Sequence, residues 1–250
     1  MNKVMSKMLV SSVGTRFTSK VAAAAFASVL SFGSANAIVV GGGITGGTAV
    51  GAGGAFIELT APFVAPIPGG SPTTSVVGNN TFQLPNLYAF NEDQNIVLPN
   101  ALNVDVGPNG TTNFSIANGT TVASHYVFFD PAGSTSITGY VDFDAAIIGV
   151  ATSTASLFAS DILQNNLVNY LSPGLRGLEG QDSVSVIAAV MINDNKRLWL
   201  DWTASTPGDY VRVFTEYSVG AVPVPAALPL FGTGLALLGV LGWRRKRRAR

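Results

Sequence analysis

Apolar and polar residues alternate through the middle of the chain. Leu102, Val104 and Val106 are separated by polar residues, a period of two that is typical of half-buried strands. An Asn-Gly dipeptide at 118–119 favours a tight turn between two such segments, because both of its residues accept a positive φ. On these grounds strands are expected at 56–60, 102–106, 112–117, 121–130, 136–144, 146–152, 183–192, 197–204 and 209–219.

Many short strands separated by Gly, Pro, Asn and Ser predict a mainly β protein. We expect an antiparallel β-sandwich, jelly-roll-like, over residues 80–221. One helix is expected at 156–171, where leucine and isoleucine recur near helical spacing. Residues 38–79 are rich in glycine and proline and are interpreted as a loosely ordered spacer that contains the first strand.

The first 37 residues have the pattern of an export signal. A basic region precedes a 12-residue apolar run at 21–32 and the small-residue motif Ala35-Asn36-Ala37. We therefore predict that signal peptidase cleaves after Ala37 and that the mature chain begins at Ile38.

The last 29 residues have three parts in order. A proline-rich motif at 222–225 is followed by an uncharged apolar run at 226–243 and a basic tail at 244–250. As a helix the apolar run would be about 27 Å long, close to the hydrocarbon thickness of a bilayer. By the positive-inside rule the tail stays in the cytoplasm. The residues expected to orient the span are Trp243, Arg244, Arg245, Lys246, Arg247 and Arg248.

This terminus resembles the PEP-CTERM class of bacterial sorting signals, in the variant with a VPLPA-type motif. The motif residues are Val222, Pro223, Val224 and Pro225, and Val224 differs from the Glu of the main class and from the Leu of the variant. The resemblance implies processing by an exosortase-type membrane enzyme, in a bacterium with an outer membrane that makes exopolysaccharide and forms biofilm. It implies an inner-membrane precursor with its body in the periplasm and a mature form at the cell surface or outside the cell. The alternative is an ordinary anchor that is never cut.

Charge is unevenly distributed along the chain. All 14 acidic residues but only four of the 14 basic residues lie in 38–221, so this body has a formal charge of −10. Such a charge excludes the basic surface that nucleic-acid binding needs. Because the chain has no cysteine, disulfides and thiol chemistry are excluded as well.

Few residues suggest catalysis or metal binding. His125 is the only histidine, and we interpret it as structural or as a surface residue rather than as part of a triad. Asp142 and Asp144 are spaced as neighbours on one face of a strand, where they would suit a glycosidase or a calcium ion, or simply the outward face. The oxygen-rich loop 91–95 is the better calcium candidate, with an ordinary polar loop as the alternative.

Aromatic residues give the one indication of a ligand surface. Trp199 is expected to point outward from its strand, and Tyr210, Arg212 and Phe214 share one face of the next. Such residues on a sheet surface would stack against and hydrogen-bond a sugar ring. In the alternative, the face is covered by the glycine- and proline-rich segment or by the helix.

Two classes of function remain. The first is a non-enzymatic protein of the cell surface or extracellular matrix, sorted by its tail, that serves adhesion, biofilm or polysaccharide association. The second is a secreted carbohydrate-active hydrolase that uses a carboxylate pair such as Asp142 and Asp144. We favour the first.

Overall fold

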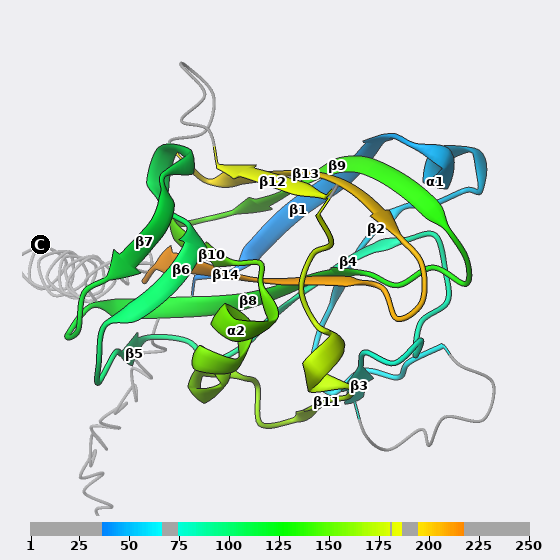
Figure 1. Cartoon of the computed structure of the whole chain (residues 1–250). Coiled ribbons are helices and arrows are strands. Elements are labelled where there is room, and N and C mark those ends of the chain that lie inside the picture. Colours follow the sequence, from blue (N-terminus) through cyan, green and yellow to red (C-terminus); the bar gives the residue numbers. More distant parts are fainter. Residues whose placement is uncertain (1–36, 67–74, 181, 187–194, 218–250) are drawn as a thin grey trace, which may run out of the picture. The chain divides into compact units, whose positions relative to one another are not determined.

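The computed structural model describes residues 37–66, 75–180, 182–186 and 195–217 (Figure 1). The expected export signal up to residue 36 and the whole expected sorting signal, 222–250, lie outside these residues. No helix in the described ranges is long and apolar enough to span a membrane.

The protein is mainly β and contains several sheets. A four-stranded sheet, here the small sheet, has the order β1-β9-β13-β12. Its strands are β1 (Val39–Gly46), β9 (Thr135–Phe143), β12 (Ser183–Val186) and β13 (Arg197–Ala204).

The large sheet has the order β2-β4-β8-β14-β10-β6-β7, and β5 pairs with β8 beside this path. Its strands are β2 (Phe56–Leu59), β4 (Leu87–Asn91), β5 (Ile96–Val97), β6 (Leu102–Val106), β7 (Thr112–Ile116), β8 (Thr121–Phe129), β10 (Ile147–Ala151) and β14 (Asp209–Glu216). Within it the pairs are antiparallel except β2 with β4.

The remaining elements are short. A parallel two-stranded sheet joins β3 (Ser75–Val77) to β11 (Val168–Tyr170). The helices are α1 (Thr48–Gly51) and α2 (Thr154–Ala159), with 3-10 turns η1 (Pro108–Gly110), η2 (Asp161–Leu163) and η3 (Pro173–Leu175).

The central strands of the large sheet, β4, β8 and β14, are buried on both faces. Val127 of β8 and Val211 of β14 belong to a cluster shared with the small sheet, which contributes residues such as Leu198. Their neighbours Phe128 and Tyr210 belong to a second cluster on the opposite face, under α2, β3 and β11 (Figure 1). Burying a side chain of the size of Leu198 stabilises the fold by roughly 1.5–3 kcal/mol.

Most expected strands are confirmed within one or two residues. The expected strand 197–204 matches β13, and 209–219 contains β14. Of the expected strand 183–192 the structure describes β12, 183–186. Period-two alternation was a good guide for β13, because this strand packs only one of its faces against a core.

Two expectations differ from the structure. The glycine-rich start of the body is not a spacer but strand β1, which pairs along its length with β9. The expected helix 156–171 is wrong: α2 ends at Ala159, and the chain continues through η2 into β11. The apolar residues at near-helical spacing do not form one buried face, since Leu157 and Leu163 are buried while Ile162 is 61% exposed.

Candidate functional site

Half-buried aromatic and charged side chains form a cluster on the outer surface of the small sheet. On β13, Leu198 points into the core, so its neighbours Arg197 and Trp199 point outward. The register with β9 places Tyr140 opposite Trp199 and Asp142 opposite Arg197. These four outward residues are called the aromatic face below.

The guanidinium of Arg197 orders this face. Its Cζ atom is 3.9 Å from the ring centroid of Tyr140 and 5.2 Å from that of Trp199, and the two centroids are 5.5 Å apart. Asp142 accepts from Arg197 Nε at 2.6 Å and Nη2 at 2.7 Å. This cation–π contact and bidentate ion pair hold the guanidinium in place. The result is a surface with aromatic rings and hydrogen-bonding groups side by side, a combination that suits a sugar ring.

Strand β1 leaves the surface beside these residues bare. Gly43 lies opposite Tyr140, and a Cβ atom there would come within 3.1 Å of the tyrosine ring. Gly41 lies opposite Asp142, and a Cβ atom there would meet nothing within 4 Å. A side chain at Gly43 would therefore require the Tyr140 ring to shift, whereas Gly41 leaves open space at the edge of the sheet.

Acidic residues lie beside the aromatic face where β12 begins. Asp201 follows Trp199 by two residues on the same side of β13 and is exposed. Opposite Asp201 is Ser183, which directly follows Asp182. Burial, together with the negative charges of Glu179 and Asp201, raises the pKa of Asp182.

Asp209 completes an acidic corner that consists of Glu179, Asp182, Asp201 and Asp209. The Asp209 side chain is 2% exposed, and burial together with the charges of Asp182 and Glu179 raises its pKa to about 8. Its Oδ2 atom has no hydrogen-bond partner among the described residues. Asp182, Asp201 and Asp209 make no ion pair with any residue that the structure describes. Asp182 and Asp201 therefore have no cationic partner among the described residues, whereas the raised pKa leaves Asp209 mostly protonated and uncharged at neutral pH.

The other half of the expected ligand surface lies elsewhere. Tyr210, Arg212 and Phe214 share a face of β14 in the large sheet, and all three are buried. Arg212 Nη1 donates to the carbonyl oxygen of Leu157 at 3.0 Å and to Ser160 Oγ at 2.8 Å, so the α2 segment covers this face. Trp199 therefore lies on a different sheet from the three β14 residues. For Tyr210, Arg212 and Phe214 the expected ligand surface is wrong, because the α2 segment covers their face, as the alternative had it.

His125 lies in the core, so the alternative of a surface residue is wrong. It is fully buried on β8; its Nδ1 is 2.8 Å from Asn91 Oδ1 and its Nε2 is 3.1 Å from Thr215 Oγ1. Burial lowers its pKa to about 3, so the ring is neutral at physiological pH. Both ring nitrogens are engaged, which leaves none for a nucleophile.

The two strand carboxylates have separate structural partners. Asp142 is bound by Arg197, and Asp144 Oδ1 accepts the backbone N–H of Ile38 at 2.8 Å. They therefore do not form an open pair in a cleft.

The oxygen-rich loop 91–95 turns one of its acids inward. Glu92 is buried and paired with Arg212, and Gln94 Nε2 donates to the carbonyl oxygen of Ser124 at 2.9 Å. Across the described ranges, no three acidic or histidine side chains are grouped closely enough to hold a metal ion.

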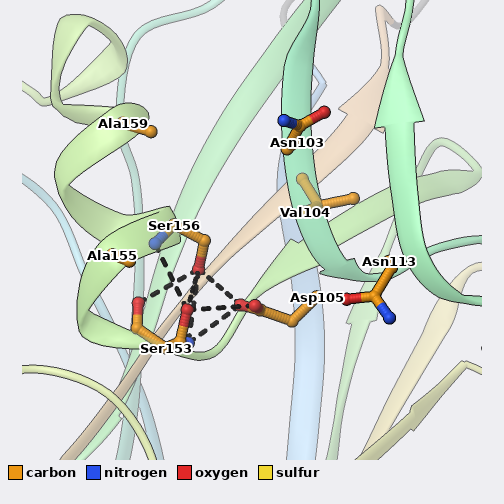
Figure 2. Close-up of a pocket in the computed structure, with 8 residues that line it drawn as sticks. All are labelled: Asn103, Val104, Asp105, Asn113, Ser153, Ala155, Ser156 and Ala159. Atoms are coloured by element: carbon orange, nitrogen blue, oxygen red, sulfur yellow. Dashed lines mark hydrogen bonds between the residues drawn. The ribbon is translucent and has the colours of Figure 1, made fainter.

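A groove of about 470 Å³ lies between β6, β7 and α2 (Figure 2). Asp105 lies on its floor and accepts from the backbone N–H groups of Thr152 at 2.6 Å and Ser153 at 2.8 Å, and from the hydroxyls of Ser153 and Ser156. Burial acts to raise the pKa of Asp105, but the hydrogen bonds from Ser156, Thr152 and Ser153 outweigh it and lower the pKa. Its oxygens are thus occupied in holding the start of α2, where Ser153 and Ser156 form a capping box.

Sequence reasoning missed Asp105, Tyr140 and Asp209 as site residues. The Ser153-x-x-Ser156 spacing was a usable signal for a helix start, although the common capping box has Glu or Gln in the last position. For Tyr140 and Asp209 the sequence held no usable signal, because the residues around them belong to segments far apart in the chain.

Comparisons of this chain with protein-family models, with curated proteins and with solved structures find no match.

Proposed function

We propose that this chain is an exported, non-enzymatic protein of the cell surface or extracellular matrix whose β-rich body contacts polysaccharide in biofilm. The observation that carries the polysaccharide contact is the stack of Tyr140, Arg197 and Trp199 on an outer sheet surface, held by Asp142. Half-buried rings next to fixed hydrogen-bonding groups are the usual means of binding a sugar ring.

Export and sorting are supported by the two ends of the sequence. The pattern of residues 1–37 favours cleavage by signal peptidase after Ala37. The tail 222–250 resembles an exosortase-type signal, with an inner-membrane precursor and a processed form outside the membrane. The negative charge of the body suits a soluble protein outside the cell.

The body is proposed to be an antiparallel, jelly-roll-like sandwich. Support comes from the apolar cluster shared by the small and large sheets and from the mostly antiparallel pairing. A rigid scaffold of this kind keeps the aromatic face in a fixed position.

The hydrolase alternative receives less support. Asp142 is already bound by Arg197, Asp144 accepts a backbone N–H, and both nitrogens of His125 are hydrogen-bonded. A glycosidase needs two carboxyl groups that face one cleft with room for a water or a sugar.

Terminal peptide mapping of the protein from its native cells, with fractionation into membrane and exported pools, tests the sorting proposal. We expect a chain that starts at Ile38 and ends near residues 223–225 in the exported pool. A chain that keeps its basic tail in the inner membrane would overturn the sorting proposal.

Co-sedimentation of the full chain with exopolysaccharide from the same cells tests the contact. Trp199→Ala should reduce the bound fraction, while Trp199→Phe, which keeps a ring, should retain most of it. Equal binding by all three proteins, or no binding at all, would contradict the proposed contact.

A further inference from the structure

The aromatic face and the acidic corner are neighbours on one surface. Trp199 and Asp201 lie two residues apart on the same side of β13, a separation of about 7 Å along a strand. Ser185 of β12 lies opposite Trp199, and Ser183 lies opposite Asp201, next to Asp182. A ligand that stacks on the indole therefore extends within one or two sugar units over the carboxylates.

The charges on this surface restrict the ligand. Arg197 is neutralised by Asp142, so it offers no free positive charge to an anionic sugar. Asp182 and Asp201 make no ion pair with any described residue. They are close enough for the charge of Asp201 to help raise the pKa of Asp182. An acidic polysaccharide would be repelled here, while a positively charged group would be attracted.

A metal ion is a poor match for this corner. Nowhere in the described part of the chain do three carboxylates come close enough to hold one cation. Charges distributed along a polymer, one on each sugar unit, fit separated carboxylates better than a single compact ion does.

We infer that the aromatic face and the acidic corner together bind a cationic amino-sugar polymer, with a sugar ring stacked on Trp199 and an ammonium group beside Asp201. The inference rests on the proposed polysaccharide contact and names its ligand class. The open space at Gly41 gives the polymer a path across β1, since no side chain stands there.

Matched probes test this ligand class. Binding of the full chain in detergent is measured by calorimetry at mildly acidic pH with chitosan oligosaccharides, chitin oligosaccharides of the same length and alginate oligosaccharides. Chitosan and chitin share a backbone and differ in the amine, which is free and charged only in chitosan. We expect the order chitosan, then chitin, then alginate, and chitosan binding that weakens as salt is raised.

Three variants locate the site. Trp199→Ala should weaken chitosan binding by about three- to tenfold through the lost stacking, and Asp201→Asn by about threefold. Gly41→Val introduces a β-branched side chain into open space, so it should leave folding intact and still weaken binding. The control is Glu58→Gln, which removes an exposed carboxylate from β2 of the other sheet and should leave binding unchanged.

Three other results would overturn the ligand class, the site or the polysaccharide contact. Equal affinity for chitin and chitosan, lost in Trp199→Ala but not in Asp201→Asn, would overturn the cationic class and leave the proposed polysaccharide contact standing. Chitosan binding that none of the three variants changes would be general attraction to an acidic protein and would overturn the site. No binding to any of the oligosaccharides or to the native exopolysaccharide would overturn the proposed contact itself.

Discussion

Glu92 and Arg212 form an ion pair whose two side chains are completely buried, although 120 residues separate them in the chain. Arg212 Nε is 2.6 Å from Glu92 Oε2, and Nη2 is 3.0 Å from Oε1. Glu92 also accepts from Ser124 Oγ and Tyr170 OH, both at 2.6 Å. Each carboxylate oxygen of Glu92 therefore accepts two hydrogen bonds. Together these contacts connect the loop after β4 to β14 and β11.

The first prediction concerns this pair. Glu92→Gln keeps the shape of the side chain but leaves the charge of Arg212 with only the longer contact to Asp161, at 3.1 Å. Loss of one partner of a buried pair typically costs about 3–5 kcal/mol, so we expect a loss of this order in the free energy of unfolding. Urea unfolding measures it, with Glu58→Gln as the exposed control that should change stability by less than about 0.5 kcal/mol. A loss no larger than that of the control would show that the pair contributes little.

The Glu92–Arg212 pair also shows what sequence pattern cannot supply. Alternation placed Tyr210, Arg212 and Phe214 on one face of a strand, and that is where they lie. It gave no information on which side of the sheet was covered, because the cover comes from α2 and from a loop distant in the chain. A strand buried on both faces needs a paired partner for any charge it carries, and that partner is set by tertiary structure.

Glycine composition is a misleading signal at the start of the body. Residues 39–46 have few side chains to pack, which favoured a spacer, yet they form β1 against β9. Gly43 makes room for the Tyr140 ring, and a Cβ atom at Gly42 would lie 2.5 Å from Phe56. The large residues of the neighbouring strands fill the space that glycine leaves, and this complementarity is not visible in the local sequence.

The second prediction concerns the cap of α2. Asp105 accepts four hydrogen bonds from Thr152, Ser153 and Ser156, so Asp105→Ala leaves these donors without their acceptor. We expect a loss of about 1–3 kcal/mol in the free energy of unfolding. Relative to the native protein, the variant should show faster amide hydrogen exchange in α2, with a smaller change in β8. Asn103→Ala in the same groove is the control, because no hydrogen bond ties it to α2. Unchanged exchange in α2 would contradict the capping role.

The third prediction is a loss of stability as pH rises. The pKa of Asp209 is about 8 in the folded protein, against about 3.9 in an unfolded chain, so folding favours the protonated form. The protonated Asp209 side chain contributes fully to the free energy of unfolding below about pH 4, and this contribution is lost as pH rises through about 8. Asp209→Asn keeps the shape without the charge and should be more stable than the native protein at pH 8, by an amount of the order of a few kcal/mol. Denaturation at pH 5 and pH 8 tests this; an unchanged pH dependence in the variant would contradict it.

The fourth prediction has the opposite sign. The folded pKa of His125 is about 3, against about 6.5 when unfolded, so protons bind the unfolded chain first. The neutral ring stabilises the fold above pH 6.5, and this contribution is lost as pH falls towards 3. The histidine ring resonances, followed by NMR, should show no titration between pH 7 and pH 5 while the protein is folded. A midpoint near 6.5 would show that the ring is accessible to water.

The fifth prediction joins the proposed processing to the fold. Ile38 donates its backbone N–H to Asp144, and cleavage after Ala37 would turn this amide into an ammonium group. Hydrogen bonds between charged groups are roughly twice as strong as neutral ones, so Asp144 should stabilise the processed chain more than the unprocessed one. Asp144→Asn should destabilise a chain that begins at Ile38 by about 1 kcal/mol, and one that keeps Ala37 by less.

A double-mutant cycle over these four proteins, measured by urea unfolding, isolates the interaction. Ala37 packs against Ala123 and Ala145, and the loss of that contact is common to both processed proteins, so it cancels. A coupling of zero would mean that the ammonium group of Ile38 binds Asp144 no more strongly than the backbone amide does. A clear coupling would mean that removal of the export signal itself strengthens the attachment of β1 to the end of β9 through Asp144.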